Sequence, residues 1–340
     1  MSLTVVGYGE LMLRLTPQEH GSLLEQSESL KFGFAGAEAN ILGDLSLLGH
    51  KVGFVSTFPK NSIGRSALKY LGQLGIDESL VTWDDGRIGT YYIEHGSSIR
   101  GTRVTYDRAN SSVTNTKITA QAWQNILRGA KYFVLTGITP ALSQVCRDNI
   151  KEALSVANMS GIKVVVDLNY RRTLWDQFSA KQSFLSILPF VDVLIGNVGS
   201  VRDIFGIGVH KFSGYDSLIK ATEIAVKGLE EISYFDCVAL TMRLQKSATE
   251  NELGGVIKRG DQYFYSASIK TEIVDRLGGG DAFTAGIIHG LINDWPEDKI
   301  IKFASASFAL TQTLKGDINY MTEAEILAVA NGAVKGYVKR

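Results

Sequence analysis

The chain has 340 residues, of which 45% are hydrophobic and 21% charged, the composition of an ordinary globular protein with enough sequence for a sizeable core. Its 35 basic and 35 acidic residues balance, so no overall charge attracts it to nucleic acid or to an acidic membrane. The two cysteines lack metal-binding spacing, and neither a signal peptide nor an apolar run of about 18 residues occurs, so we expect a cytoplasmic protein.

The N-terminal part of the chain alternates short apolar strands with helices. We predict a strand, a helix, a strand and a helix over residues 5–9, 36–49, 51–57 and 62–74. This alternation is typical of a parallel sheet flanked by helices. The Gly7-Tyr8-Gly9 turn hints at a dinucleotide-binding fold, but Met12 stands where that fingerprint needs a third glycine.

The alternation breaks between about residues 86 and 114. Two β-rich segments, 89–94 and 103–106, are separated by small and polar residues and predict a hairpin outside the main sheet. A strand pair outside the main layer is a candidate lid. We expect one α/β domain over residues 1–340, with a lid formed within it by about 10–34 and 86–114.

The alternation returns at about residue 119. Further elements are predicted as strands over 131–135, 163–167, 191–195 and around Ala239, and as helices over 144–158, 281–293, 297–313 and 322–335. The run Val164-Val165-Val166 is apolar on both faces, as in strands buried inside a parallel sheet. These elements predict a three-layer α/β/α fold with a mainly parallel central sheet.

Polar residues follow several of the buried strands. Gly137 follows one strand, Asp167-Leu-Asn-Tyr-Arg171 follows a second, and Gly196-Asn197 follows a third. In open α/β sheets, ligands bind beyond the carboxyl ends of the strands. The sequence therefore predicts that these segments line one crevice.

A glycine run, Gly278-Gly279-Gly280, leads into an apolar helix whose first carboxylate is Asp281. Glycines at a helix start let backbone N–H groups approach an anion, which the helix dipole also favours. A carboxylate beside such an anion pocket makes chemical sense if it takes a proton from a hydroxyl that then attacks a phosphate. The segment is a candidate phosphoryl-transfer site; the alternative is a flexible loop followed by Asp281 as a helix N-cap.

Two separated signatures carry a family resemblance. Ala35-Gly-Ala-Glu-Ala-Asn40, followed by Gly49 and Gly64, resembles the sugar-side signature of the ribokinase-like (PfkB) carbohydrate kinases, and Val274-Asp-Arg-Leu-Gly-Gly-Gly-Asp-Ala-Phe283 resembles their C-terminal signature. Both occur in the family's order, and the match spans most of the chain. The resemblance implies the ribokinase-like fold with a β-strand lid.

Within the family, the chain is most similar to 2-keto-3-deoxygluconate kinases. The similarity is carried by Gly9-Glu-Leu-Met-Leu-Arg14, Tyr106-Asp-Arg-Ala-Asn-Ser-Ser112, Thr136-Gly-Ile-Thr-Pro140 and Asp167-Leu-Asn-Tyr-Arg171. Such enzymes transfer the γ-phosphate of ATP, with Mg²⁺, to the terminal hydroxyl of a deoxy keto sugar acid. The resemblance also implies a homodimer, or a higher homo-oligomer, built through the lids.

The resemblance implies roles for residues at the matching positions. Asp281 is expected to be the base that acts beside the glycine run. The sugar-acid site is expected to contain Gly36, Asn40, Tyr91, Tyr106, Arg108, Arg171 and Asp317, and the nucleotide is expected to contact Asn169, Tyr170, Asn197, Thr241, Gly278, Gly279 and Gly280.

The substrate's carboxylate suits the two arginines, because a guanidinium offers a planar fork for a carboxylate. The alternatives are that Arg108 and Arg171 are solvated surface residues, and that Tyr91 and Tyr106 are cross-strand partners in the hairpin. Asn40 could equally be an ordinary polar residue at a helix start. His95, His210 and His289 show no metal-ligand spacing, so we expect no metal site built from protein residues alone.

Two positions depart from the family pattern. Many members carry Asn-x-x-Glu near the metal and phosphates, whereas Asn197-Val-Gly-Ser200 ends in serine, so Mg²⁺ would be held through water and ATP oxygens. Members of the family usually have a glycine two residues after the position of Thr241, and this chain has Arg243 there. These departures affect the nucleotide side more than the sugar side.

The expected activity is therefore ATP-dependent phosphorylation of the 6-hydroxyl of 2-keto-3-deoxygluconate, giving 2-keto-3-deoxy-6-phosphogluconate. Alternatives are a kinase for 2-keto-3-deoxygalactonate or a neutral ketose such as fructose, and a non-catalytic sugar- or nucleotide-binding sensor. A nicotinamide dehydrogenase is disfavoured because the third glycine of its fingerprint is absent after Gly9. A Walker-type kinase is disfavoured because the sequence has no Gly-x4-Gly-Lys-Ser/Thr loop.

Overall fold

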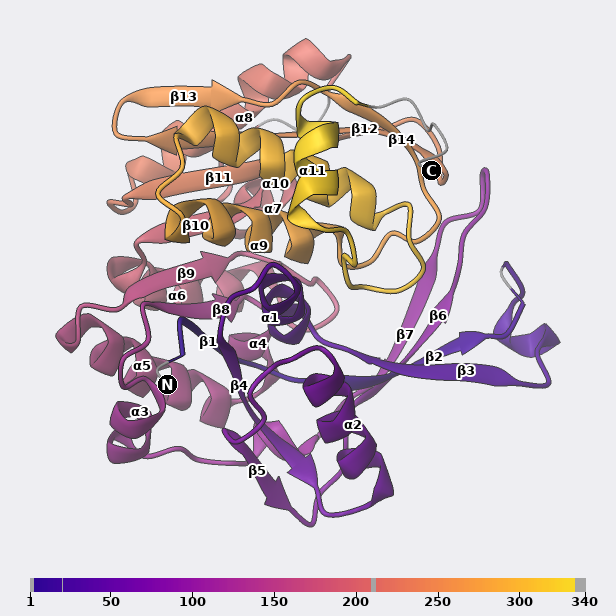
Figure 1. The fold of residues 1–340 in the computed structure, drawn as a ribbon, viewed down its shortest axis with the longest axis vertical. Coiled ribbons are helices and arrows are strands. Elements are labelled where there is room, and N and C mark those ends of the chain that lie inside the picture. Colours follow the sequence, from indigo (N-terminus) through magenta and orange to yellow (C-terminus); the bar gives the residue numbers. More distant parts are fainter. Residues whose placement is uncertain (1–2, 20, 209–211, 334–340) are drawn as a thin grey trace.

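The computed structural model describes residues 3–19, 21–208 and 212–333. Within these residues, one large sheet has the strand order β13-β12-β11-β10-β9-β8-β1-β4-β5, with β14 beside β12 (Figure 1). Its strands are β1 (Val5–Tyr8), β4 (Val52–Pro59), β5 (Val81–Asp84), β8 (Tyr132–Thr136), β9 (Lys163–Asp167), β10 (Val193–Asn197), β11 (Cys237–Gln245), β12 (Glu250–Arg259), β13 (Gln262–Tyr265) and β14 (Ile269–Glu272).

Helices cover both faces of this sheet, each over its own hydrophobic core. One face carries α1 (Ala37–Leu47), α2 (Ser62–Gln73), α9 (Gly279–Ile292) and α10 (Glu297–Thr311). The other carries α3 (Ala120–Ile126), α5 (Gln144–Met159), α6 (Gln177–Ile187), α7 (Val198–Phe205) and α8 (Tyr215–Glu230). The remaining helices are α4 (Thr139–Leu142), α11 (Glu323–Ala330), which packs on α10, and the 3-10 turns η1 (Leu24–Gln26), η2 (Ser112–Thr114) and η3 (Leu188–Phe190).

Strand β9 shows why the two cores form. It pairs in parallel with β8 and β10. Val164 and Val166 point into one core and Val165 into the other, because successive side chains in a strand point to opposite faces. The apolar run is therefore buried on both sides, which confirms the predicted three-layer α/β/α fold.

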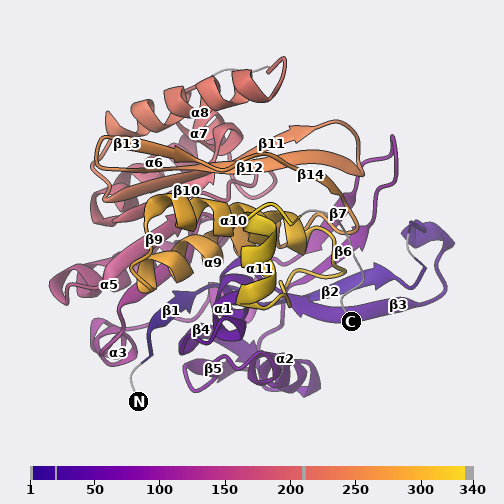
Figure 2. The same ribbon diagram turned by 45° about the horizontal axis from the view of Figure 1, so that its top comes forward.

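A second, four-stranded sheet projects from one side of the molecule (Figures 1 and 2). Its strand order is β3 (Leu30–Ala35), β2 (Met12–Pro17), β6 (Thr90–Glu94) and β7 (Arg103–Asp107). Strands β6 and β7 pair antiparallel, which confirms the predicted hairpin. The small sheet lies where the lid segments were predicted; its action as a lid and the single-domain assignment stay predictions.

Some elements differ from their predicted bounds or were not predicted. Helix α9 begins at Gly279, two residues before the predicted start, and α11 ends at Ala330, with residues 334–335 of that prediction outside the described part of the chain. Helices α6, α7 and α8 were missed. Strands β12, β13 and β14 were also missed; they pair antiparallel, so the mainly parallel sheet has an antiparallel edge.

The register of the parallel strands gathers their carboxyl ends. Asp167 at the end of β9 pairs with Thr136 of β8 and with Ile195 of β10, and Asn197 of β10 pairs with Thr241 of β11. Polar residues that follow different strands therefore lie at one edge of the sheet. Among the helices of the described residues, none has the length and apolar composition needed to cross a membrane.

Candidate active site

Asp281 lies in the first turn of α9, at this edge of the sheet. Gly278, with a φ of 74°, is the N-cap, and Gly279 and Gly280 already belong to the helix. Asp281 is 8% exposed and accepts a hydrogen bond from Asn40 Nδ2 of α1 at 2.8 Å. Gly278 rather than Asp281 is the N-cap, so the alternative in which Asp281 serves only as a helix N-cap is wrong.

The surroundings of Asp281 favour its protonated form. Burial is the main reason that the pKa of Asp281 rises to about 7; the negative charge of Asp167 adds to the rise, whereas the hydrogen bond from Asn40 opposes it. Burial likewise raises the pKa of Asp167 to about 6. A carboxylate with a pKa near neutrality is well matched to general-base chemistry at physiological pH.

A crevice of about 560 Å³ opens beside Asp281. Polar side chains from the ends of β9, β10 and β11 form its wall, together with the start of α9. The predicted site residues that line it are Asn169, Arg171, Asn197, Thr241, Gly278, Gly280 and Asp281. The structure thus brings together most of the predicted nucleotide contacts, the predicted base and one of the two predicted carboxylate-binding arginines.

The glycines at the start of α9 are each placed differently. Gly278 has a left-handed φ of 74°, and a Cβ there would overlap the carbonyl oxygen of Asp317. A Cβ on Gly279 would lie 3.0 Å from the ring of Phe308. A Cβ on Gly280 would meet nothing within 4 Å, because Gly280 borders the open crevice.

Asn197 and Tyr170 make contacts that the sequence did not predict. Asn197 Oδ1 accepts a hydrogen bond from Ser200 N at 2.9 Å and so caps α7, while the residue also lines the crevice. Tyr170 is not among the lining residues of the crevice; its hydroxyl donates to the carbonyl oxygen of Trp175 at 3.2 Å. The structure therefore separates Tyr170 from the other predicted nucleotide contacts.

Arg108 is buried rather than solvated, so the surface alternative is wrong for this residue. It is 8% exposed, and its Nε donates to Glu10 Oε2 at 2.9 Å. Its guanidinium also lies 5.4 Å from the ring centroid of Tyr106. Tyr106 pairs directly with Tyr91 across the hairpin and stacks on it at 6.0 Å, which confirms the cross-strand alternative for the two tyrosines.

Glu10 links Arg108 to the predicted sugar-side residues, and sequence reasoning missed it although it lies in the quoted segment 9–14. A Cβ on Gly36 would overlap the carbonyl oxygen of Glu10. The N–H of Gly36 donates to Asn40 Oδ1 at 3.4 Å, and Asn40 holds Asp281. Gly36 and Asn40 therefore lie beside the candidate base, while Arg108 does not line the same crevice as Arg171.

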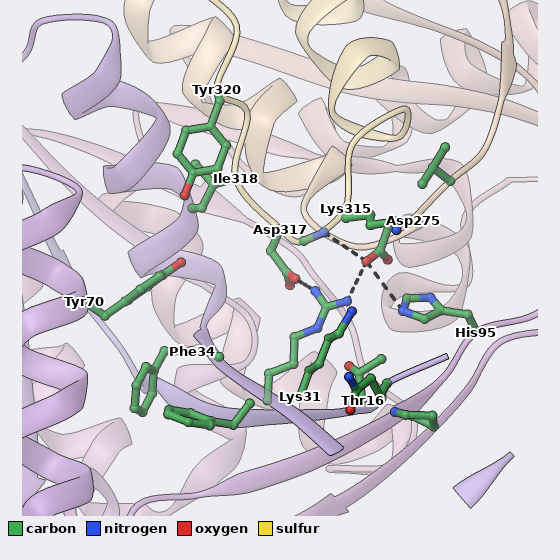
Figure 3. Close-up of a pocket in the computed structure, with 17 residues that line it drawn as sticks. Thr16, Lys31, Phe34, Tyr70, His95, Asp275, Lys315, Asp317, Ile318 and Tyr320 are labelled. Carbon is green, nitrogen blue, oxygen red and sulfur yellow. Dashed lines mark hydrogen bonds and ion pairs between the residues drawn. The ribbon is translucent and has the colours of Figure 1, made fainter. Parts of the chain in front are cut away.

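Asp317 lies in a second pocket of about 370 Å³, between the small sheet and the loop that precedes α11. Arg14 of β2 forms ion pairs there with Asp317 and with Asp275, the latter at 2.5 Å. Figure 3 shows Asp275 and Asp317 on one side of this pocket, with His95 beside Asp275. The side chain of Asp317 thus binds an arginine, and its backbone lies against Gly278.

Two further arginines, Arg243 and Arg276, line the crevice and were not predicted as site residues. Arg171 is exposed and Arg243 only partly so; burial lowers the pKa of Arg243 to about 10, helped by the positive charges of Arg276 and Arg171. The sequence carried one signal for each residue: Arg276 lies inside the C-terminal signature, and Arg243 stands where the family usually has a glycine. Three arginines against the two carboxyl groups of Asp167 and Asp281 give the crevice an excess of basic side chains, which suits an anion.

The sequence profile of the pfkB family carbohydrate kinases matches residues 2–225 and 248–324 of the chain. The chain belongs to this family. The kinase is 34% identical to 2-dehydro-3-deoxygalactonokinase of Haloferax volcanii over 99% of both sequences. It is 27% identical to 2-dehydro-3-deoxygluconokinase of Bacillus subtilis, over 96% of this chain and 95% of the relative.

The fold of the kinase also matches a solved structure of this kind. The crystal structure of 2-dehydro-3-deoxygluconokinase from Thermotoga maritima superimposes with a TM-score of 0.92 and 33% identity, covering 98% of this chain and 99% of that one. The kinase is therefore an enzyme with the ribokinase-like fold, which confirms the resemblance seen in the sequence.

The residues of the crevice fit a Mg²⁺ ion that is bound partly through substrate. The described part of the kinase contains no group of three or more His, Cys, Asp or Glu that could hold a metal ion, and His210 lies outside that part. Oxygen-bearing side chains of Asp167, Asn169 and Asn197 line the crevice. Mg²⁺ typically takes one or two such ligands and completes its shell with water and phosphate oxygens.

Proposed function

We propose that the kinase uses ATP to phosphorylate the 6-hydroxyl of 2-keto-3-deoxygluconate, giving ADP and 2-keto-3-deoxy-6-phosphogluconate. The observation that carries this proposal is the buried, ionisable Asp281 at the start of α9, beside a cationic crevice. The names of the relatives support the substrate class, because 2-dehydro-3-deoxy sugar acids are 2-keto-3-deoxy sugar acids.

In this mechanism, Asp281 accepts the proton of the 6-hydroxyl while that oxygen attacks the γ-phosphorus and the bond to ADP breaks. Asn40 orients Asp281 through its hydrogen bond. Backbone N–H groups of Gly279 and Gly280 face the anion at the positive end of the α9 dipole. Mg²⁺ would neutralise phosphate charge. General-base help supplies about 10²–10⁴-fold, and each N–H donor to the growing charge is worth about 3 kcal/mol.

Recognition of the acid is assigned to Arg171. This side chain makes no hydrogen bond or ion pair within the described residues, and it shares the crevice with Asp281. Arg108 is held by Glu10, so its charge is already compensated. Glu10 Oε1 is buried without a hydrogen-bond partner in the described part of the chain, which leaves it available to accept a bond from a sugar hydroxyl.

The substrate proposal is tested with a panel of acceptors. We expect the highest kcat/KM with 2-keto-3-deoxygluconate among the two epimeric 2-keto-3-deoxy sugar acids and fructose, measured as ADP release with Mg²⁺ and ATP. Fructose should be the poorest acceptor, because it leaves Arg171 unpaired. Equal or faster turnover of fructose would overturn the assignment to sugar acids.

The galactonate epimer is the second candidate, because the Haloferax volcanii relative carries that name at 34% identity. A higher kcat/KM for 2-keto-3-deoxygalactonate in the same panel would select it. The non-catalytic sensor is not proposed further, since the family match and the named kinases support an enzyme.

The pH dependence of turnover follows from the raised pKa of Asp281. Only the ionised carboxylate accepts a proton, so kcat/KM for the sugar acid should rise with pH, flatten above about 7 and fall about tenfold per pH unit below it. The measurement is a profile from about pH 5 to 9 at saturating nucleotide. Activity that is flat from about pH 5 upward would mean that a group of ordinary carboxylate pKa, or none, is responsible.

The location and assembly of the kinase remain part of the proposal. We propose a cytoplasmic enzyme that forms a homodimer through the small sheet, which also acts as its lid. Support for the dimer comes from β3, where Leu30 and Phe32 are 39% and 68% exposed. Exposed apolar side chains gathered on one strand are typical of contact surfaces.

A further inference from the structure

Two arginines that reach the crevice from different segments have no role in the mechanism above. Arg243 lies on β11, two residues after Thr241, and Arg276 lies two residues before Gly278. The family profile leaves residues 226–247 unmatched, so Arg243 belongs to a part of the chain where the family pattern is interrupted. Both side chains nevertheless line the same cavity as Asp281.

Within the part of the chain that the structure describes, neither Arg243 nor Arg276 forms an ion pair with a carboxylate. Arg276 donates from Nη2 to Ser247 O at 3.1 Å and from Nε to Ala248 O at 3.2 Å, and both acceptors are neutral carbonyls. Arg243 lies over the ring of Phe308, with Cζ at 5.2 Å from the centroid.

This arrangement is costly in the absence of an anion. Burial disfavours the charged form of Arg243, and the positive charges of Arg276 and Arg171 disfavour it further, which is why its pKa falls to about 10. Burial also lowers the pKa of Arg276. Both arginines are only partly exposed, and a charged side chain that is partly removed from water is stabilised when a counter-charge pairs with it. The missing counter-charge therefore belongs to a ligand with several negative charges.

We propose that Arg243 and Arg276 form a clamp for the outer phosphates of the nucleotide and so make the crevice selective for a triphosphate. This inference rests on the proposed use of ATP. The clamp shares one cavity with Gly278, Gly280 and Asp281, so its ligand lies where the transferred phosphoryl group must be. A guanidinium fork matches two phosphate oxygens, and the Phe308 ring and the two carbonyls hold the forks in place before the ligand arrives.

A purely structural role predicts a different outcome. Arg276 could serve only to brace the turn between β11 and β12 through Ser247 and Ala248, and Arg243 could serve only to pack on Phe308. Substitution would then lower stability, or weaken every nucleotide equally. A phosphate clamp instead predicts an effect that grows with the number of phosphates.

The test measures the affinity of the full chain for Mg²⁺–ATP, Mg²⁺–ADP and AMP by calorimetry, without any sugar. The variants are Arg243→Met and Arg276→Met, which keep length and packing but remove charge, and Arg243→Lys, which keeps the charge without the fork. Arg259→Met is the matched control, because Arg259 is a half-exposed arginine on the neighbouring strand β12 that pairs with Glu297.

Each Met variant should weaken ATP binding by about 10- to 100-fold and ADP binding by less, and should leave AMP binding nearly unchanged. Arg243→Lys should recover part of the loss, and the control should bind all three nucleotides like the parent. An equal loss for ATP and AMP, or unchanged ATP binding, would overturn the clamp. A parent that binds ATP but phosphorylates no sugar acid would refute the proposed substrate and leave this result standing.

Discussion

Replacing Asp281 with asparagine should lower kcat by about 10²–10⁴-fold, because the variant keeps the shape of the side chain and loses the proton acceptor. Affinities for Mg²⁺–ATP and for the sugar acid should stay close to those of the parent. The hydrogen bond from Asn40 also has an acceptor in the amide, so the first turn of α9 should keep its structure. Initial rates of ADP release and calorimetric binding constants measure the two effects separately.

Stability provides an independent check on this variant. Because burial raises the pKa of Asp281 to about 7, the folded chain binds this proton more tightly than the unfolded chain does. The stability linked to Asp281 is therefore present at low pH and is lost as the pH rises through about 7, so Asp281→Asn should be at least as stable as the parent at pH 8. The low activity could then not be ascribed to unfolding.

The matched control for this variant is Asp298→Asn. Asp298 also lies in the first turn of a helix, α10, but it is exposed and pairs with Lys302. Its loss changes the charge at a helix start without touching the crevice, so turnover should not change. If Asp281→Asn phosphorylates the sugar acid at nearly the parent rate, Asp281 is not the base.

Replacing Arg14 with methionine should lower the free energy of unfolding by about 3–5 kcal/mol, because it removes the arginine that pairs with two buried carboxylates. The side chains of Arg14, Asp275 and Asp317 are 11%, 3% and 8% exposed. Arg14 joins the small sheet to two segments that contact the start of α9. Asp275 accepts a hydrogen bond from Leu277 N at 3.3 Å, and the backbone of Asp317 packs on Gly278. Turnover should therefore fall as well.

Chemical denaturation of the parent and of two further variants tests this explanation. The triple variant Arg14→Met, Asp275→Asn, Asp317→Asn removes the uncompensated charges and should be clearly more stable than Arg14→Met alone. Arg87→Met removes an ion pair with Asp107 of the same small sheet that is exposed on both sides, so it should cost far less stability than Arg14→Met. A triple variant no more stable than Arg14→Met would show that lost packing, rather than buried charge, is responsible.

The predictable part of the fold rested on local patterns. The spacing of apolar residues in α1 and the double-sided apolar run of β9 reflect periods that each element imposes on its own side chains. The polar residues after β9 and β10 could be assigned to one crevice because parallel strands place their carboxyl ends together. The glycine run marked the start of α9 because a backbone φ of 74°, which Gly278 has, is one that glycine adopts without strain.

The pairings that govern the chemistry of the site were beyond local patterns. Asp281 and Asn40 lie 241 residues apart in the sequence, and Arg108 and Glu10 lie 98 apart. Nothing in the sequence around Arg108 shows that its guanidinium is buried against Glu10. The unpaired state of Arg243 was equally hidden, because the absence of a partner is a property of the whole surrounding structure.

The amino-acid sequence by itself determined the layered α/β architecture, the family, and the place of the glycine run and its acid on one helix. These features follow from side-chain periodicity and backbone sterics within short segments. Only the tertiary structure decided which charges are neutralised within the protein: Arg14 and Arg108 are bound to buried acids, whereas Arg171, Arg243 and Arg276 form no ion pair within the described residues. Electrostatic energy depends on distance and burial in space, and the folded chain sets both.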